Sequence, residues 1–315
     1  MTDAISALVT AFLITIIAVP ATIKLATKFG LVDDPKLRPH PAHVHKTIIP
    51  RAGGLPIYLG IILAAAIFLP IEKHLIGIFL GITILLSLGL ADDKLTTFNP
   101  YLRLFLLFLA AFCAVGSGIG VAFITNPLSH FNLPGLLSTN IIRLDQIIIP
   151  FNFLGDHSIV LIADIFAFFW IVTLTQVINW SKGVDGQMPG ITLVAAITLG
   201  LFSLKLVSQG DSNQLGVATL SFITAGSALA FLIFNWYPAK ILPGFSGSTI
   251  LAFMLATLSI LSGAKLATAL LVLAIPSIDF IYTFLRRVLQ GKSPVWGDRG
   301  HLHHKLLDLG WTPVQ

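Results

Sequence analysis

The chain has 315 residues, of which 56% are hydrophobic and only 10% are charged. A soluble domain carries roughly a quarter charged residues, so this composition excludes an ordinary soluble globular protein, and it excludes a disordered chain because disorder needs low hydrophobicity and high charge. Lysine and arginine exceed aspartate and glutamate by 19 to 14, and in so apolar a chain this excess indicates membrane topology first, far ahead of nucleic-acid binding.

Two further features narrow the class of protein. The mean hydropathy of +0.91 indicates a chain whose surroundings are mostly lipid. The single cysteine, Cys113, excludes a framework of disulfide bonds and a zinc site built from cysteine ligands.

The apolar stretches predict membrane-spanning helices, because a span needs about 20 mostly apolar residues. They are continuous rather than alternating, which favours helices over the strands of a barrel. The first stretch has no preceding basic segment and no following cleavage site, so it is interpreted as a span and not as a signal peptide. We expect an all-α, polytopic membrane helix bundle of about nine spans, near residues 4–26, 52–71, 74–91, 101–125, 158–178, 190–209, 214–234, 244–263 and 265–286.

The positions of lysine and arginine predict the orientation of these spans. With the N-terminus outside, fifteen of these residues fall on the inner side and four on the outer side, which is a positive-inside bias. The one long outer loop, 126–157, contains an isoleucine-rich stretch from Ile141 to Ile149 that could form a short hairpin. We expect a single integral-membrane domain over 1–315 that ends ahead of a terminal helix, with inner segments 27–51, 92–100, 179–189, 235–243 and 287–315.

Titratable residues gather on this predicted inner side. Carboxylates bind Mg²⁺, and Lys, Arg and His side chains bind phosphate oxygens, so the mixture suits an anionic, metal-bound substrate at the membrane surface. Asp279 lies about 10 Å below the inner boundary and is a functional candidate as an intramembrane acid. The other inner acids and histidines are Asp33, Asp34, Asp92, Asp93, Asp185, Asp298, Asp308, His40, His43, His45, His301, His303 and His304.

Asp92 and Asp93 stand at the inner end of the third span. Two adjacent carboxylates repel each other, so the pKa of one tends to rise unless a cation lies between them. One interpretation is a metal ligand beside a catalytic base. The other is a solvated helix end with Lys94 as its counter-charge. The sequence leaves both open.

Two glycine-containing turns follow. In NWSKGVDGQMPG, Asp185 lies among glycines that permit close approach of the backbone to a ligand, and Asn179 and Lys182 add an amide and a cation; an ordinary turn between helices has the same composition. The turn PAKILPGFSGSTI at 238–250 can present free N–H groups at a helix N-terminus to an anion. Small residues that serve close helix packing explain it as well.

The last inner segment contains the dense donor and acceptor cluster GDRGHLHHKL at 297–306. Phosphate or nucleobase contacts suit it better than zinc, because His303 and His304 diverge on any regular element and no Cys or Glu completes a ligand set. The first inner loop attracts anionic lipid through its basic charge. Its end, PRAGG at 50–54, leads directly into a span and is a more specific motif than attraction to lipid would need.

The inner motifs occur in the order GLVDDP (30–35), HKTIIPRAGG (45–54), LADDK (90–94), N-x5-DG (179–186), PAK-x3-G-x2-GS (238–248) and DRGHLHH (298–304). This set resembles the polyprenyl-phosphate N-acetylhexosamine-1-phosphate transferase superfamily, whose bacterial members begin lipid-linked peptidoglycan, O-antigen and teichoic-acid synthesis. The resemblance extends from Gly30 to about Leu309, with Arg103 where the family commonly has lysine. The order of the motifs, rather than any one of them, makes it specific.

The resemblance implies a Mg²⁺-dependent phosphoglycosyl transferase, with Mn²⁺ as a substitute, in the bacterial inner membrane with a cytoplasmic active site. Such an enzyme transfers a sugar-1-phosphate, N-acetylhexosamine-1-phosphate above all, from a UDP-sugar to a polyprenyl phosphate and releases UMP for cell-envelope glycan synthesis. The implied partners are the UDP-sugar, the polyprenyl phosphate and membrane lipid, with no nucleic acid, and the resemblance also allows a homodimer.

The resemblance also implies roles for single residues. The catalytic and metal-binding carboxylates would be Asp92, Asp93 and Asp185, with one of the first two deprotonating or positioning the acceptor. The residues implied in substrate binding are Lys46, Asn179, Lys182, Arg299, His301, His303 and His304.

Two positions depart from the family pattern. The family's Asp-Gly-x-Asp-Gly keeps its first pair, but Met188 and Pro189 replace the second, and Phe245 stands where Gly-Asp-x-Gly-Ser has a metal-binding aspartate. These departures leave a non-catalytic lipid- and nucleotide-binding protein as an alternative. A transporter is the second alternative, disfavoured because the polar residues cluster on one side and no internal repeat is evident.

Overall fold

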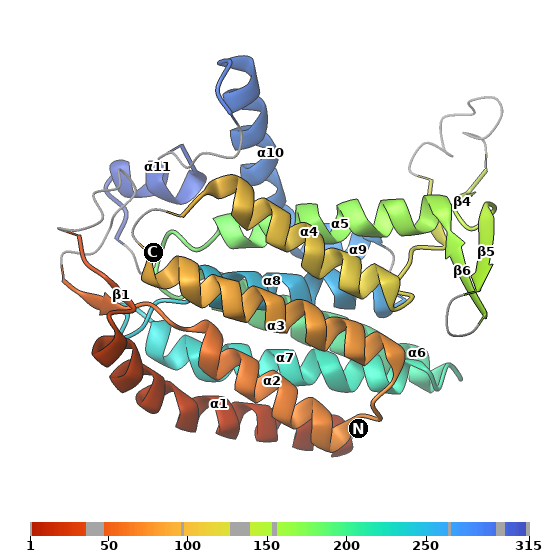
Figure 1. The fold of residues 1–315 in the computed structure, drawn as a ribbon, viewed down its shortest axis with the longest axis horizontal. Helices are drawn as coiled ribbons and strands as arrows, with labels where there is room; N and C mark the ends of the chain where they lie inside the picture. The colour runs from red at the N-terminus through yellow and green to blue at the C-terminus, as the bar shows by residue number, and fades with distance from the viewer. Residues whose placement is uncertain are drawn as a thin grey trace.

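The computed structural model describes residues 2–35, 47–95, 98–126, 139–152, 156–263, 266–293 and 300–312. Its helices are α1 (Thr2–Phe29), α2 (Gly54–Phe68), α3 (Lys73–Lys94), α4 (Pro100–Gly116), α5 (Leu161–Trp180), α6 (Gln187–Ser208), α7 (Gln214–Asn235), α8 (Gly244–Leu261), α9 (Leu266–Val272), α10 (Ala274–Leu289) and α11 (Leu302–Asp308). The long helices run roughly antiparallel in one bundle (Figure 1), which confirms the predicted all-α membrane fold.

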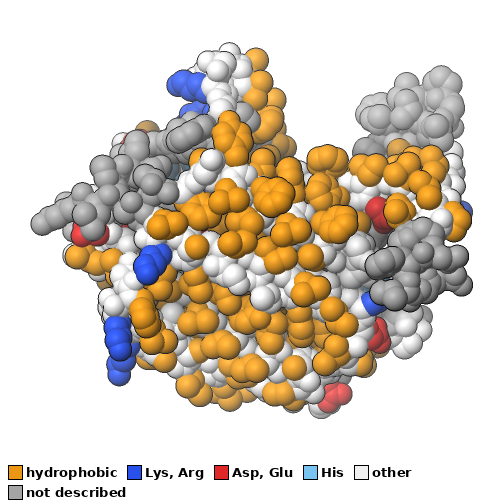
Figure 2. All heavy atoms as spheres, viewed as in Figure 1, with side chains coloured by type: hydrophobic (Ala, Val, Ile, Leu, Met, Phe, Trp, Pro, Cys, Tyr) orange, Lys and Arg blue, Asp and Glu red, His pale blue; other side chains and the backbone are white. Residues whose placement is uncertain are grey.

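Six of the described helices are long and apolar enough to cross a membrane, namely α1, α3, α5, α6, α7 and α8. The shorter helices α2 and α4 are also apolar, and they cover two of the other predicted spans. Apolar side chains extend over the flank of the bundle in Figure 2, whereas most of the visible Lys and Arg side chains lie toward the end that carries β1 and α11. This distribution is that of a multi-pass membrane protein.

The ninth predicted span, 265–286, is not one helix. It is divided at Leu273 into α9 and α10, and α10 rises out of the bundle in Figure 1. Pro276 lies in the first turn of α10, where its missing N–H is tolerated, and this position favours the start of a new helix. The prediction of a single straight span was therefore wrong at this point.

Helix α8 forms the centre of the bundle and contacts α2, α3, α5, α6 and α7. Nearly all of its side chains are buried, including large ones such as Phe253 and Met254. Its Gly, Ala, Ser and Thr residues allow neighbouring backbones to approach closely, which is how membrane helices associate in the absence of a hydrophobic driving force between them. The N-terminus of α8 is thereby held at a fixed place among the other helix ends.

Short strands lie at the two ends of the bundle. At one end β1 (Val32–Asp33) pairs with β2 (Ile49–Pro50); at the other, β3 (Phe123–Thr125) pairs with β4 (Ile141–Arg143), and β5 (Ile148–Asn152) with β6 (Asp156–Val160), all antiparallel. The isoleucine-rich stretch from Ile141 to Ile149 therefore contributes to two pairs. It does not form the hairpin with itself that its sequence suggested.

The described parts of the predicted inner segments 27–51, 92–100, 179–189 and 235–243 lie with α11 at the end that carries β1 and β2, here called the charged end (Figure 1). Hydrogen bonds between the segments fix this arrangement: the N–H of Leu242 donates to the carbonyl of Pro50, and the N–H of Gly53 donates to the carbonyl of Leu242. The segment before α8 is thus tied to the segment before α2. Four of the five predicted inner segments thus share one end of the bundle with α11, whereas the start of the fifth, 287–293, follows α10 away from it.

Candidate active site at the charged end

Asp93, in the last turn of α3, is bound to the first turn of α8. Its Oδ1 accepts from the backbone N–H of Phe245 (2.6 Å), and its Oδ2 accepts from the N–H (3.2 Å) and the hydroxyl (2.6 Å) of Ser246. Gly244 has a φ of +67°, and a β-carbon at this position would collide with the Asp93 carboxylate. The turn at 243–248 is thus anion-binding as its sequence indicated, but the anion is a carboxylate of the chain itself.

Arg51 joins three acids at this end. Its Nε lies 3.0 Å from Asp93 Oδ1, its Nη2 3.8 Å from Asp92 Oδ2, and its Nη1 3.5 Å from Asp33 Oδ1. The backbone around Arg51 is fixed, since its N–H donates to the carbonyl of Leu31. The PRAGG segment therefore places a guanidinium between the two adjacent carboxylates, which lowers their mutual repulsion.

Asp92 has a different environment from that of Asp93, although both are almost completely buried. Its Oδ1 lies 2.5 Å from Nε of Arg103, a residue near the start of α4 whose side chain is 36% exposed. Its Oδ2 is buried and, within the described part of the chain, accepts no hydrogen bond, although Arg51 Nη2 lies 3.8 Å from it. Among the two carboxylates, Asp92 is thus the one with an oxygen left for a further proton or ligand.

Lys182, in the turn between α5 and α6, points toward the start of α8. Its Nζ donates to Asn179 Oδ1 (2.8 Å), Ser248 Oγ (3.0 Å) and the Gly244 carbonyl (3.2 Å). It also lies 5.4 Å from the centre of the Phe245 ring. Burial lowers the pKa of Lys182 to about 7, the neighbouring Arg51 cation lowers it too, and nearby carboxylates oppose this.

Asp185 lies in the same turn but has other partners. Its Oδ2 accepts from the backbone N–H of Ala239 at 2.9 Å, and the next residue, Gly186, donates its N–H to Asn235 Oδ1 at 3.0 Å. The amide group of Asn235 in turn donates to the carbonyl of Ile241. These bonds tie the turn at 181–186 to the segment 236–243, so Asp185 has a structural role in addition to any catalytic one.

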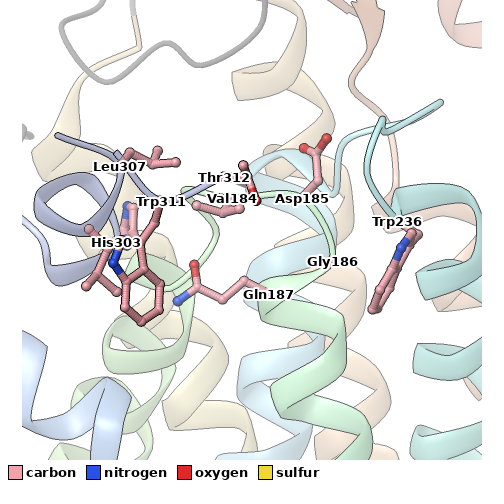
Figure 3. A pocket seen from close by; sticks show the side chains of 10 residues that line it. Val184, Asp185, Gly186, Gln187, Trp236, His303, Leu307, Trp311 and Thr312 are labelled. Atoms are coloured by element: carbon pink, nitrogen blue, oxygen red, sulfur yellow. The ribbon is translucent and has the colours of Figure 1, made fainter. Parts of the chain in front are cut away.

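A cavity of about 310 Å³ opens beside Asp185 (Figure 3). Gln187 and the backbone of Gly186 border it, with Trp236 on one side and Trp311 on the other. The remaining lining residues are Val184, Asp185, His303, Leu306, Leu307 and Thr312. Such a space, with aromatic walls and a few polar groups, is near the lower limit of small-molecule sites.

Two of the predicted histidines are held by specific neighbours. Nδ1 of His301 lies 2.9 Å from Asp279 Oδ2, and the N–H of Leu302 donates to Asp279 Oδ1 at 2.7 Å. His303 lies against Gly183, where no β-carbon would fit. Burial, then the neighbouring imidazoles, lower the pKa of His303 to about 3, so that it is neutral at pH 7. Asp279 therefore belongs to this end of the molecule, as its depth suggested.

The predicted site residues thus divide into two groups. Asp93, Asn179 and Lys182 contact the start of α8, and Asp92 lies next to Asp93 and pairs with Arg103. Asp185 and His303 instead border the cavity. Asn179 and Lys182 are not among the residues that line this cavity. His301 and His304 are buried close to His303. Lys46 and Arg299 lie outside the described residues.

The carboxylates do not form a ready-made metal centre. Within the described ranges, no three His, Cys, Asp or Glu side chains are grouped so that they could hold one metal ion. Asp93 already accepts four hydrogen bonds, counting that from Arg51, and Asp185 is bonded to Ala239. The predicted set of Asp92, Asp93 and Asp185 does not fit Mg²⁺ in this arrangement, and the Mg²⁺ requirement itself stays a prediction.

Several residues of the site were not identified from the sequence. Arg51 and Ser246 have no spacing that marks them as partners of Asp93, because the contact joins segments far apart along the chain. Trp236 and Trp311 stand in inner segments without a motif that marks them as cavity residues. The Pro-Arg-Ala-Gly-Gly motif was the one available signal for Arg51.

Comparison with known proteins gives a consistent result. The family model described as glycosyl transferase family 4 matches residues 75–263. A probable undecaprenyl-phosphate N-acetylglucosaminyl 1-phosphate transferase of Bacillus subtilis (strain 168) is 29% identical, with the alignment covering 96% of this chain and 78% of that protein.

Two further relatives align over similar lengths. The decaprenyl-phosphate N-acetylglucosaminephosphotransferase of Mycobacterium leprae is 30% identical over 96% of this chain and 76% of its own. An undecaprenyl-phosphate alpha-N-acetylglucosaminyl 1-phosphate transferase of Escherichia coli (strain K12) is 23% identical over 98% and 77%. The family match covers more than half of the chain and includes Asp92, Asp93, Asp185 and Phe245, so this protein belongs to glycosyl transferase family 4.

Proposed function

We propose that this protein transfers a sugar-1-phosphate, of the N-acetylhexosamine class, from a UDP-sugar to a membrane polyprenyl phosphate. The observation that carries the proposal is Asp92: a buried carboxylate with one oxygen that accepts no hydrogen bond from the described residues, beside Arg51 and Arg103, at the charged end of the bundle. The relatives support the substrate class, since their names specify polyprenyl-phosphate acceptors and N-acetylglucosamine phosphate as the transferred group.

In the proposed reaction, an oxygen of the polyprenyl phosphate attacks the β-phosphorus of the UDP-sugar. The new P–O bond gives polyprenyl-diphospho-sugar, the bond between the α- and β-phosphates breaks, and UMP leaves with the electron pair. Asp92 Oδ2 would accept the acceptor's proton or position its oxygen, because it is the carboxylate oxygen of the pair that accepts no hydrogen bond from the described residues. The guanidinium groups of Arg51 and Arg103 would stabilise the charge on the phosphates.

The cavity beside Asp185 is the place that we propose for part of the donor. Trp236 and Trp311 offer flat apolar walls, and Gln187 offers an amide that can both donate and accept hydrogen bonds. His303, neutral at pH 7, can do the same at one edge. The sequence had assigned the nucleotide to Asn179 and Lys182, but these residues face α8. We assign it instead to the residues that follow them in the chain and line the cavity.

We propose that the charged end lies in the cytoplasm of a bacterium, at the inner membrane, because the lysine and arginine bias assigns it to the inner side. The acceptor's apolar chain would stay in the bilayer while its phosphate reaches Arg103, the more exposed of the two arginines. Mg²⁺ is the metal that the resemblance implies, and no step here depends on it.

The test is release of UMP by the purified protein with undecaprenyl phosphate and a panel of UDP-sugars. We expect release that depends on both substrates and a lipid product that carries the sugar and one additional phosphate. Binding of UDP-sugar and lipid without turnover would instead support the non-catalytic alternative, for which the buried Phe245 and Met188 are the evidence. If neither substrate bound, the proposal would be wrong.

A further inference from the structure

Lys182 fills a cage of oxygen atoms at the start of α8. All three N–H groups of an ammonium have an acceptor here: an amide oxygen of Asn179, the hydroxyl of Ser248 and the carbonyl of Gly244, at 2.8, 3.0 and 3.2 Å. Amide and carbonyl oxygens are among the ligands that hard metal cations take in proteins. The cage is therefore suited to a cation, and a side chain of the protein supplies one.

Phe245 closes the cage with a surface that cannot ligate a metal. The centre of its ring lies 5.4 Å from Lys182 Nζ and 5.6 Å from Arg103 Cζ. An aromatic face attracts a cation through its quadrupole but offers no lone pair. A divalent ion would have to displace the ammonium from the cage. It would gain only three neutral oxygens as ligands and would lie close to the Arg103 guanidinium.

The acids around the cage are already paired with cations of the chain. Asp93 is bound by Arg51 and by the first turn of α8, and Asp92 is bound by Arg103. A metal ion would have to displace a guanidinium from a buried carboxylate before either acid could coordinate it. Removing one partner from a buried charge pair is costly.

We propose that the ammonium group of Lys182 is the resident cation of this site and excludes a divalent metal ion from it. A catalytic role for the ammonium, namely neutralising the phosphate charge of the substrates, rests on the proposed function. The exclusion of a metal ion from the cage does not depend on that function. The substitution Phe245→Asp would then create no metal site by itself, because the new carboxylate would lie between Lys182 and Arg103 and pair with them.

Binding of Mn²⁺, a paramagnetic probe for hard divalent cations, tests this directly by electron paramagnetic resonance of the purified full chain. The proteins to compare are the wild type, F245D, F245D/K182M and the matched control F245D/K240M. Lys240 is an exposed lysine of the neighbouring segment, so its substitution removes the same charge without opening the cage. We expect F245D/K182M to bind one Mn²⁺ at least about tenfold more tightly than F245D, and F245D/K240M to behave like F245D.

Equal Mn²⁺ affinity in F245D and F245D/K182M would overturn the proposal, as would one tightly bound Mn²⁺ in the wild type that Lys182→Met leaves unchanged. If the Phe245 variants do not fold, the wild type and K182M are compared by thermal unfolding with and without Mn²⁺. A rise in Tm confined to K182M supports the proposal, and an equal rise in both contradicts it. Absence of UMP release in all folded proteins would refute the proposed function without altering these binding results.

Discussion

The backbone N–H of Phe245 donates a 2.6 Å hydrogen bond to the carboxylate of Asp93, across a separation of 152 residues. This bond joins the end of α3 to the start of the most buried helix, α8. The two adjacent acids therefore have different roles. Asp93 caps a helix inside the protein, whereas Asp92, one residue earlier, keeps an oxygen that accepts no hydrogen bond from the described residues. The identical side chains are thus expected to respond differently to the same substitution.

Asp93→Asn should destabilise the fold. The amide cannot replace the charge that faces Arg51, and its NH₂ group would oppose the N–H donors of α8, so the free energy of unfolding should fall by about 3 kcal/mol. Unfolding of the purified protein in detergent measures this. Asp211→Asn, at an exposed position, is the control and should change the free energy by less than about 0.5 kcal/mol. Wild-type stability in Asp93→Asn would contradict the capping role.

Asp92→Asn should reduce turnover strongly and destabilise the fold less than Asp93→Asn does, because its partner Arg103 is 36% exposed and stays hydrated when the carboxylate is lost. It keeps the shape of the side chain but removes the oxygen that we assign to the acceptor's proton, so kcat should fall by about 100-fold or more. UMP release and circular dichroism on the same preparation separate activity from folding. If Asp92→Asn retained near-normal turnover, Asp92 would be only an ion-pair partner of Arg103 at a helix end.

The activity should depend on the protonation of Lys182. With the pKa of Lys182 at about 7 in the free protein, raising the pH through this value removes its positive charge, so kcat/KM should decrease on the alkaline side. Lys182→Arg carries a guanidinium that stays charged over this range, and its profile should lack that decrease. The comparison cancels the titration of the substrates, and identical profiles in both proteins would rule out this role for the lysine.

The orientation in the membrane can be tested by labelling single cysteines in a background without Cys113. Lys94→Cys and Lys292→Cys lie at exposed positions in predicted inner segments, and Lys73→Cys lies at an exposed position in a predicted outer one. In intact cells an impermeant reagent should label only the cysteine at position 73. Labelling of position 94 but not 292 from outside would disprove the shared side, and labelling of both would invert the topology.

Much of the fold follows from the sequence alone, because hydropathy is a local property. Stretches of apolar residues long enough to cross a bilayer are recognised without knowing their neighbours. Successive spans cross in opposite directions, so every second connecting segment lies at the same end, and these segments contain most of the Lys and Arg residues. The α9–α10 break is the exception. There the hydropathy favoured one span, while Pro276 and the polar residues of α10 directed the chain out of the bundle.

The sequence by itself determined the class of protein and predicted the end of the bundle that carries the candidate site, since these depend on composition and on motif order. Only the tertiary structure decided which oxygen meets which cation. Asp93 with Phe245, Arg51 with Asp93 and Lys182 with Ser248 are separated by 152, 42 and 66 residues. Close packing around α8 brings them together, and no periodicity along the chain encodes such contacts.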